Sequence, residues 1–344
     1  MKKKLRALFV VVCVIALFLP GCSLRLDRFM PKDAPVSDLP AEALLLNGED
    51  IYQQTLTFIQ DAKTSIYIEQ TVLEDPSLIG AVIQKAQAGV EVRILLDQWQ
   101  SANKATVEQL KNHNISVQYY PALKGQLNHV KMLVVDYTQA ILYGAAWRNE
   151  DWASHTIAVV LPEKSSRRCA DVFAKDWEFT TTLSLSVPEN NTAPADQITL
   201  AKDANVKQQI LPLIRASTQA IDIELTEISD PDTAAALIQA AEKDVAIRLL
   251  VDADQAKNTP VTLENLQTQG VVIRYYQNSE NQPALNCNFA LFDHTALIFS
   301  GSGWTNAVFV RNHEYSVTIP SAAATAKLSQ FFETDWQAAS PDLL

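Results

Sequence analysis

Apolar residues in this chain gather in short runs that alternate with amphipathic stretches, beginning near residue 50. Residues 50–62 and 77–88 have the spacing typical of helices, whereas residues 65–69 and 90–96 are apolar runs of strand length. Strands that alternate with helices in this way predict an α/β fold, in which a mixed sheet is flanked by helices.

The same succession of elements appears a second time, with helices predicted at residues 204–216 and 232–243 and strands at residues 220–224 and 245–251. Similar residues recur in the same order, and the offset between the copies grows slowly. The matches are Glu69 with Glu224 (155 residues apart), Asp97 with Asp252 (155), Tyr120 with Tyr276 (156), Asp136 with Asp293 (157), Gly144 with Gly301 (157) and Trp177 with Trp336 (159). An order kept with so little drift indicates an internal duplication.

The duplication defines the predicted domain organisation, with a first half at residues 41–182 and a second half at residues 196–340. Pro188 and Pro194 interrupt the pattern between them. Tryptophans recur at equivalent positions of the two copies, which predicts that they pack in the core. These are Trp147, Trp177, Trp304 and Trp336.

The N-terminus has the order of features found in an export signal. A basic start is followed by a nearly continuous apolar run at residues 7–19, which is too short for a comfortable membrane span. The run leads to Gly21 and Cys22, an arrangement that resembles a bacterial lipobox, although Pro20 departs from it. We therefore expect residues 1–21 to be a lipoprotein signal peptide, Cys22 to be lipidated, and residues 22–40 to form a tether. An ordinary signal peptide or an uncleaved anchor is the alternative.

If the organism has two membranes, Ser23 after the lipidated cysteine favours an outer-membrane location facing the periplasm. Removal of the basic start would lower the formal net charge from −11 to −15. So acidic a chain repels nucleic acid at long range, which makes a nuclease the less favoured function. Cys169 and Cys287 would remain in the mature chain, and their spacing indicates neither a disulfide framework nor a metal site.

The strongest chemical signal is His129-Val130-Lys131, with Asp136 five residues further on. On a strand, alternate residues share a face, so His129 and Lys131 should point the same way and Val130 should face the core. A neutral imidazole is a nucleophile for phosphorus, and a lysine two residues away supplies positive charge for a phosphate oxygen. A surface histidine and lysine on an edge strand is the plain alternative for an isolated string of this kind.

A duplicated α/β chain with H-x-K-x4-D at this place resembles the phospholipase D superfamily, and the resemblance covers roughly residues 41–338. It implies two halves related by a pseudo-two-fold axis, with one active site between them. It also implies that one histidine attacks a phosphodiester and becomes phosphorylated while the histidine of the other half protonates the leaving alcohol. By this resemblance His129, Lys131 and Asp136 are assigned to the catalytic site.

The second copy departs from the family pattern. Its string is Asn286-Cys287-Asn288, with Asp293 kept as part of the structural motif. Asparagine can neither accept the phosphoryl group nor act as a general acid. We expect Cys287 to pack in the core as Val130 does, and Asn286 and Asn288 to contact substrate.

The residues that follow the two motifs differ as well. The family usually carries Gly-Ser-x-Asn, and the second copy retains Ser302, a predicted substrate-binding residue, where the first has Ala145. Glu314 resembles the family's acid that orients the histidine of the opposite half, and the first copy has Thr156 at the equivalent place. The resemblance thus implies that His129 keeps its orienting acid, Glu314, and that the other histidine and its acid are lost together.

The lost histidine removes the general acid, whose loss typically costs about 10² to 10⁴ in rate. His313 and His155 are alternative donors, although His313 should point away from the cleft if Glu314 points into it. Lys124, Arg148 and Arg311 would add local positive charge or lie at the rim.

The sequence favours a membrane-tethered phosphodiesterase of the phospholipase D type that acts on phospholipid head groups through a phosphohistidine at His129. A catalytically impaired relative that binds a phosphate-containing ligand or a protein partner is the second hypothesis, and a nuclease is the third. No cofactor or metal is expected, and the chain is expected to be a monomer because its two copies already supply both sides of the site.

Overall fold

The computed structural model describes residues 39–120, 124–189, 195–279 and 283–343. The predicted signal peptide, the lipidation site Cys22 and nearly all of the predicted tether lie outside these residues. Residues 37–344 form one compact unit. Among the described residues, no helix is both long enough and apolar enough to cross a bilayer.

The first half is built on a mixed seven-stranded sheet with the order β1-β8-β6-β5-β2-β3-β4. Its strands are β1 (Leu44–Leu45), β2 (Ser65–Gln70), β3 (Glu91–Asp97), β4 (Ser116–Tyr120), β5 (Met132–Val135), β6 (Gln139–Tyr143) and β8 (Ala158–Leu161). β2, β3 and β4 are parallel, whereas β5 runs antiparallel to β2 and forms a hairpin with β6.

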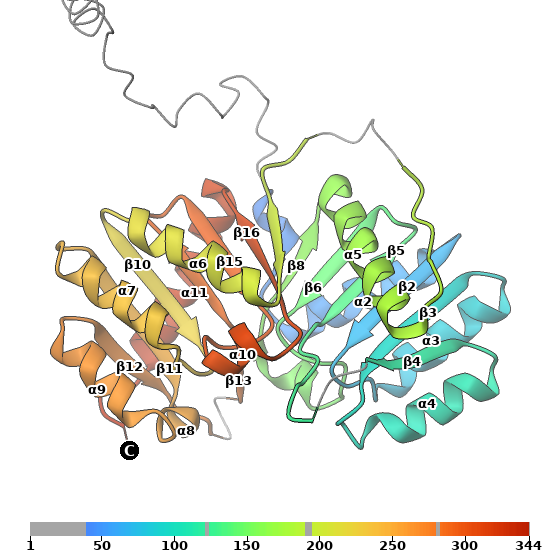
Figure 1. Ribbon diagram of the computed structural model, residues 1–344, viewed down its shortest axis with the longest axis horizontal. Helices are drawn as coiled ribbons and strands as arrows, with labels where there is room; N and C mark the ends of the chain where they lie inside the picture. The colour runs from blue at the N-terminus through green and yellow to red at the C-terminus, as the bar shows by residue number, and fades with distance from the viewer. Residues whose placement is uncertain (1–38, 121–123, 190–194, 280–282, 344) are drawn as a thin grey trace, which may run out of the picture. The chain divides into compact units, whose positions relative to one another are not determined.

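The second half repeats this arrangement in a sheet with the order β12-β11-β10-β14-β15-β16-β9. Its strands are β9 (Thr199–Lys202), β10 (Ala220–Leu225), β11 (Ala246–Asp252), β12 (Val272–Tyr276), β14 (Phe289–Phe292), β15 (Ala296–Ser300) and β16 (Tyr315–Ile319). Two mixed sheets of the same topology confirm the predicted α/β fold of two halves (Figure 1).

Helices cover both faces of each sheet. The larger ones are α2 (Gly48–Asp61), α3 (Pro76–Gln87), α4 (Asn103–Asn112), α5 (Glu163–Thr181), α6 (Ala204–Ala216), α7 (Pro231–Ala241), α9 (Pro260–Thr268) and α11 (Ala322–Ala338). The short ones are η2 (Ala41–Ala43), η3 (Asp151–Ala153), α8 (Ala253–Ala256) and α10 (Asn306–Val310). Apolar residues of α2, α3 and α4 pack on one face of the first sheet, and those of α6, α7 and α9 pack on one face of the second.

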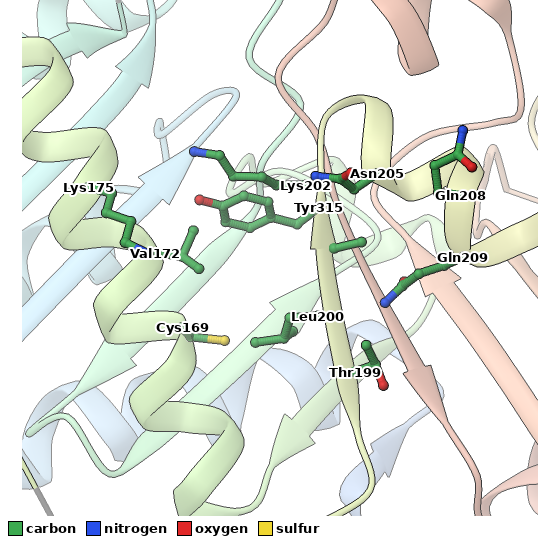
Figure 2. Close-up of a pocket in the computed structure, with 11 residues that line it drawn as sticks. Cys169, Val172, Lys175, Thr199, Leu200, Lys202, Asn205, Gln208, Gln209 and Tyr315 are labelled. Atoms are coloured by element: carbon green, nitrogen blue, oxygen red, sulfur yellow. The ribbon is translucent and has the colours of Figure 1, made fainter. Parts of the chain in front are cut away.

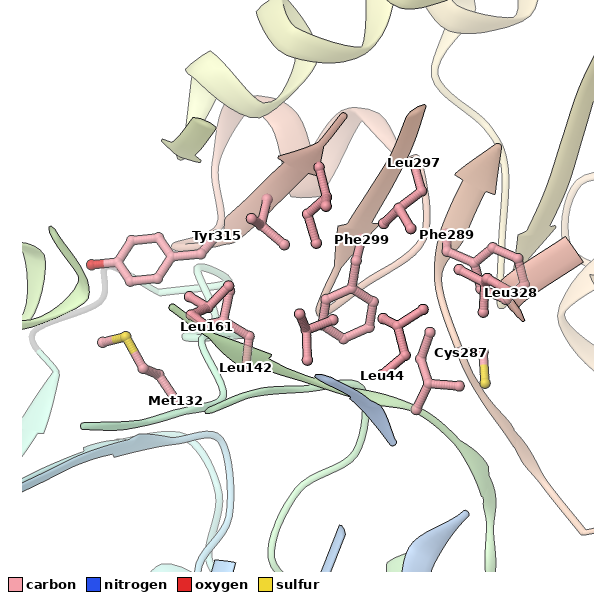
Figure 3. Close-up of a cluster of buried hydrophobic side chains, with 14 of the residues drawn as sticks. Leu44, Met132, Leu142, Leu161, Cys287, Phe289, Leu297, Phe299, Tyr315 and Leu328 are labelled. Atoms are coloured by element: carbon pink, nitrogen blue, oxygen red, sulfur yellow. The ribbon is translucent and has the colours of Figure 1, made fainter. Parts of the chain in front are cut away.

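The other faces of the two sheets share one central core with α5 and α11. Phe173 and Trp177 of α5 and Phe332 and Trp336 of α11 belong to this cluster together with strand residues of both halves. Figure 3 shows Met132 and Leu142 of the first half near Phe299 and Tyr315 of the second. The four tryptophans expected in the core are all buried, so the halves are joined by a continuous apolar interior.

Backbone hydrogen bonds also join the two halves. The short strands β7 (His155–Thr156) and β13 (Leu285–Asn286) pair in parallel across the seam. At the symmetry-related place His129 N donates to His313 O at 2.8 Å, and His313 N donates to Leu127 O at 2.9 Å. The backbone of each motif therefore lies directly beside the opposite half.

Most predicted elements differ from the observed ones by one or two residues, and the helix at residues 204–216 coincides with α6. His129 and Lys131 were expected to lie on a strand, but β5 starts only at Met132. His129 and Lys131 therefore precede the strand, and their neighbour Val130 is buried as expected.

Candidate active site

A cleft of about 600 Å³ lies where the two halves meet at the duplicated motifs. Residues of both halves line it. They include His129, Lys131, Arg148 and Asp151 from the first half, and Glu227, Asn286, Asn288, Gly301 and Ser302 from the second. The cleft thus contains the first and third residues of each motif, whereas Asp136, Asp293 and Glu314 are not among its described lining residues.

His129 is held from the opposite half of the chain. Its Nδ1 lies 2.7 Å from the hydroxyl of Ser302 and 3.9 Å from Oε2 of Glu314. Burial lowers the pKa of His129 to about 3, and the charge of Lys131 contributes in the same direction. The imidazole is therefore neutral at physiological pH, which is the state that a nucleophile requires. The predicted proximity of His129 and Glu314 is confirmed, with Ser302 as the direct neighbour.

Lys131 lines the cleft together with His129. Its Nζ donates to the carbonyl of Gly301 at 2.7 Å and to that of His129 at 3.3 Å. Burial lowers the pKa of Lys131, whereas the charge of Glu314 opposes that shift. Conversely, burial raises the pKa of Glu314, whose charge is favoured by Lys131 and by the Ser302 hydroxyl. Lysine and glutamate therefore stabilise each other's charged forms beside the histidine.

Gly301 makes this close assembly possible. A Cβ atom at this position would lie 2.8 Å from His129 O, 2.9 Å from Glu314 Oε1 and 3.3 Å from Lys131 Nζ. Gly144 occupies the equivalent place in the first half, where a Cβ would lie 2.4 Å from Asn286 O. Both copies thus keep a glycine beneath the motif of the opposite half, although only one motif keeps its histidine.

The second motif lines the same cleft but has asparagines in place of the histidine and the lysine. Asn286 takes the place of the histidine, and its carbonyl accepts a bond from Thr156 Oγ1 at 3.3 Å. The side chain of Asn288 is buried, and its Oδ1 accepts bonds from N and Oγ1 of Thr226, both at 2.9 Å. Asn288 thus secures the end of β10 in addition to lining the cleft. Cys287 is fully buried in the central core, as predicted.

Asp136 is not among the described residues that line the cleft, which corrects its assignment from the sequence to the catalytic site. It lies in the β5–β6 turn with a φ of 50°, at the end of β5 remote from His129. Its carboxylate accepts bonds from the backbone of Lys63, Thr64 and Ser65. Asp293 makes the equivalent contacts with residues 218–220. Both aspartates anchor a hairpin to the start of a neighbouring strand.

The two histidines considered as substitute acids face away from the cleft. His313 is almost fully buried, and its Nδ1 lies 2.8 Å from Asp203 while its Nε2 lies 3.4 Å from Asp176. The Nε2 of His155 lies 2.9 Å from Asp335. Neither residue is among those that line the cleft in the described part of the chain. Both histidines instead belong to buried clusters at the interface between the halves.

Among the basic residues named from the sequence, Arg148 lines the cleft, where it pairs with Asp151 at 3.0 Å. Lys124 and Arg311 are not among the described lining residues.

Sequence reasoning assigned to the site none of the four acidic residues that line the cleft, which are Asp252, Asp254 and a pair with raised pKa values, Asp151 and Glu227. Burial raises the pKa of both carboxyl groups, and Arg148 opposes the shift at Asp151, whereas a bond with Ser229 opposes it at Glu227. Neither residue belongs to the H-x-K-x4-D string, and the two do not occupy equivalent positions of the copies. No sequence signal distinguishes them from surface acids.

A second cavity of about 460 Å³ lies between α5 and β9 and contains none of the motif residues. Figure 2 shows Cys169 and Val172 of α5 on one side and Leu200 and Tyr315 on the other.

Comparison with known proteins identifies the family of the duplicated fold. A family model described as "Cardiolipin synthase, PLD-like domain" matches residues 55–177 and again residues 210–336. Two curated relatives, the mitochondrial cardiolipin hydrolases of Chlamydomonas reinhardtii and Xenopus laevis, are 21% and 23% identical over 128 and 133 residues. These matches cover 37% and 39% of this chain and 56% and 62% of the two relatives.

Solved structures share the fold over nearly the whole chain. Phosphatidylserine synthase of Haemophilus influenzae superposes with a TM-score of 0.67 and 14% identity over 90% of this chain and 89% of its own. Polyphosphate kinase of Porphyromonas gingivalis gives a TM-score of 0.62 and 15% identity over 93% of this chain and 52% of its own.

The duplicated fold and the His129 site define a member of the phospholipase D superfamily. Within that superfamily, the chain belongs to the family of the cardiolipin synthase PLD-like domain, whose model matches each half once.

Proposed function

We propose that this protein is a phosphodiesterase of the phospholipase D type, with His129 as its nucleophile. The observation that carries the proposal is the contact of His129 Nδ1 with Ser302 at 2.7 Å and with Glu314 at 3.9 Å, across the interface between the halves. A neutral imidazole fixed through one ring nitrogen presents the other to a substrate.

In the proposed reaction, Nε2 of His129 attacks phosphorus and the bond from phosphorus to the leaving alcohol breaks. Nδ1–H donates to the Ser302 hydroxyl, which donates in turn to Glu314, so the positive charge that develops on the imidazole is stabilised. Lys131 binds a non-bridging phosphate oxygen. Water or an acceptor alcohol then attacks the phosphohistidine, the phosphorus–nitrogen bond breaks and His129 is regenerated.

The leaving alkoxide needs a proton, and Asn286 cannot supply one. We assign this role to Glu227, which lines the cleft from the same half as Asn286. Burial raises its pKa, and a carboxyl group that holds its proton more tightly is a better general acid near neutral pH. The same carboxylate accepts the proton of the attacking water in the second step.

A phospholipid head group is the substrate class that we propose. The family description and the curated relatives name cardiolipin, and the first structural neighbour acts in phosphatidylserine synthesis. The predicted lipidation of Cys22 would place the cleft beside a membrane, and the net charge of −11 disfavours nucleic acid.

The test is to trap the covalent intermediate. The purified full-length protein is mixed with a panel of 32P-labelled phospholipids in vesicles, quenched and examined for acid-labile phosphate. We expect label and head-group release in the wild type and neither in His129→Ala. Glu227→Gln should slow both label formation and head-group release without abolishing either, because the head group leaves in the step that forms the phosphohistidine. If no substrate labels the wild type above His129→Ala, the enzyme proposal fails.

The second candidate is a protein that binds a phosphate group without turnover. It is favoured by Asn286 and Asn288, which replace a histidine and a lysine of the family pattern in the same cleft. In that case phospholipid vesicles would bind the wild type, and Lys131→Ala would weaken binding, without any labelled intermediate.

A further inference from the structure

Each half contributes a histidine to a buried cluster with two carboxylates of the other half. His313 lies among Glu69 and Asp176, and His155 lies among Glu224 and Asp335. The two clusters are equivalent under the duplication and lie outside the proposed catalytic site. They differ in the hydrogen-bond donors around the carboxylates, because the His155 cluster lacks donors that the His313 cluster has.

In the His313 cluster, nearby donors compensate the acids. Asn128 donates to Glu69 at 3.0 Å, Lys202 donates to Asp176 at 2.7 Å, and the hydroxyl of Tyr315 donates to Asp176. Within the described residues, one oxygen of Glu69 and Nε2 of His313 are the atoms of this cluster that lack a hydrogen bond.

The His155 cluster has lost these donors. By motif alignment and sheet register, Leu285, Leu46 and Ile157 occupy the places of Asn128, Lys202 and Tyr315. Glu224 is fully buried, neither of its carboxylate oxygens has a hydrogen-bond partner in the described structure, and its ion pair with Nε2 of His155 at 3.4 Å shares that nitrogen with Asp335. A buried carboxylate without donors is costly unless a cation is paired with it.

The His155 cluster also contains a thiol, which is a further possible metal ligand. Cys287 stands where the first motif has Val130, and its Sγ lies 3.2 Å from the carbonyl of His155. The Nε2 of His155, a carboxylate oxygen of Glu224 and Sγ of Cys287 all lie within 4.8 Å of one another. Oδ2 of Asp335 lies 2.9 Å from the same Nε2. Tetrahedral zinc ligands lie about 3.3–3.6 Å apart, so small side-chain rotations would bring the first three groups to one ion, and Asp335 lies beside the imidazole of that group.

We propose that His155, Glu224 and Cys287, with Asp335 as the fourth ligand, form a structural zinc site between the halves. A thiolate, an imidazole and carboxylates are ligands that Zn²⁺ accepts together. On this view, the second motif has exchanged its catalytic histidine for a metal-binding cysteine one residue away. The ligands come from four separate segments, so no spacing in the sequence reveals the site.

The experiment measures metal directly and does not use enzymatic activity, so its result is independent of the proposed catalytic function. The full-length protein is expressed with added Zn²⁺ or Co²⁺, purified, dialysed and examined by elemental analysis and absorption spectroscopy. We expect about one metal ion per chain and, with Co²⁺, a thiolate-to-cobalt charge-transfer band. Cys287→Val, which restores the residue of the first motif, should abolish the band.

Two control variants make the result specific. Cys169→Ala removes a buried cysteine outside the cluster and should retain metal and band, as should His313→Asn in the other cluster. Glu224→Gln keeps the side-chain volume and should lower the metal content at least tenfold, so it serves as a second test if Cys287→Val does not fold. A wild-type protein without bound metal, or metal retained in Glu224→Gln and Cys287→Val, would overturn the proposal.

Discussion

The two halves have the same fold and different chemistry. Both keep the hairpin aspartate, Asp136 or Asp293, and both keep the glycine that lies beneath the opposite motif. The first half alone keeps His129 and Lys131, and the second alone keeps Glu314 and Ser302. Because a histidine and its orienting acid come from opposite halves, the loss of a histidine from the second copy and of an acid from the first has removed one complete half-site and left the other whole.

The largest effect is expected from making the halves alike. Asn286→His, Asn288→Lys, Ala145→Ser and Thr156→Glu together would rebuild the second half-site, and Gly144 still leaves the space beneath it. A restored histidine would act as general acid, so the turnover rate should rise by up to about 10² to 10⁴. Head-group release measures this gain. The control is Asn286→Ala, which should give no gain, and an unchanged rate in the fourfold variant would contradict the half-site interpretation.

His313→Asn tests the interface cluster that keeps its donors. Removal of one member of a buried ionic network should cost about 3–5 kcal/mol of unfolding free energy. Burial alone would lower the pKa of His313, but Asp176, Asp203 and Glu69 raise it well above its usual value. The stabilisation is therefore present below about pH 6.5 and is lost as the pH rises through the raised pKa.

Urea unfolding of wild type and His313→Asn at several pH values measures this difference. His113→Asn, on the exposed end of α4, is the control and should be nearly neutral. A stability difference that grows with pH would contradict the assigned charge of His313.

Glu314→Gln probes the retained half-site, and we expect turnover to fall about 10²-fold because the imidazolium loses its counter-charge. Ser302→Ala should act in the same direction, since the hydroxyl contacts His129 directly. Thr156→Val at the position equivalent to Glu314 is the matched control and should leave kcat within about twofold. Equal losses at the two positions would show that the halves are not functionally distinct.

The smallest effects are expected from the hairpin aspartates, which both halves keep. Asp136→Asn and Asp293→Asn should each destabilise the fold by about 1–2 kcal/mol, because each weakens bonds to a charged acceptor. Burial alone would raise the pKa of both aspartates, but backbone donors lower it. Thermal unfolding measures the stability, and neither variant should change kcat by more than about twofold. A selective catalytic loss in Asp136→Asn would restore its assignment to the active site.

The sequence predicts the architecture well because the duplication repeats each local pattern twice. The offset between the copies also relates Glu314 to Thr156, and the resemblance to the superfamily pairs Glu314 with His129, a proximity that the structure confirms at 3.9 Å. Asp136 was assigned to the site because it belongs to the same string, yet a strand of four residues separates it from the histidine. The H-x-K-x4-D motif therefore predicted the family but not the function of each residue within it.

Other features depend on contacts between residues far apart in the chain. Ser302 was expected to bind substrate, and its contact with His129 spans 173 residues. The clusters around His313 and His155 are assembled from both copies, and no local pattern reveals them. Burial, which raises the pKa of Glu227, is likewise a property of the folded chain.

Backbone hydrogen bonds between the two halves determine how substrate would enter the cleft and how product would leave it. Separation of the halves would break the β7–β13 pair and the bonds between the segments around His129 and His313, and it would also expose the shared apolar core. The proposed reaction should therefore proceed without a domain hinge, by diffusion through the mouth of the cleft. Selection among alcohols then falls to the side chains of the fixed rim, so substrate range should change with rim substitutions and not with the length of the linker between the halves.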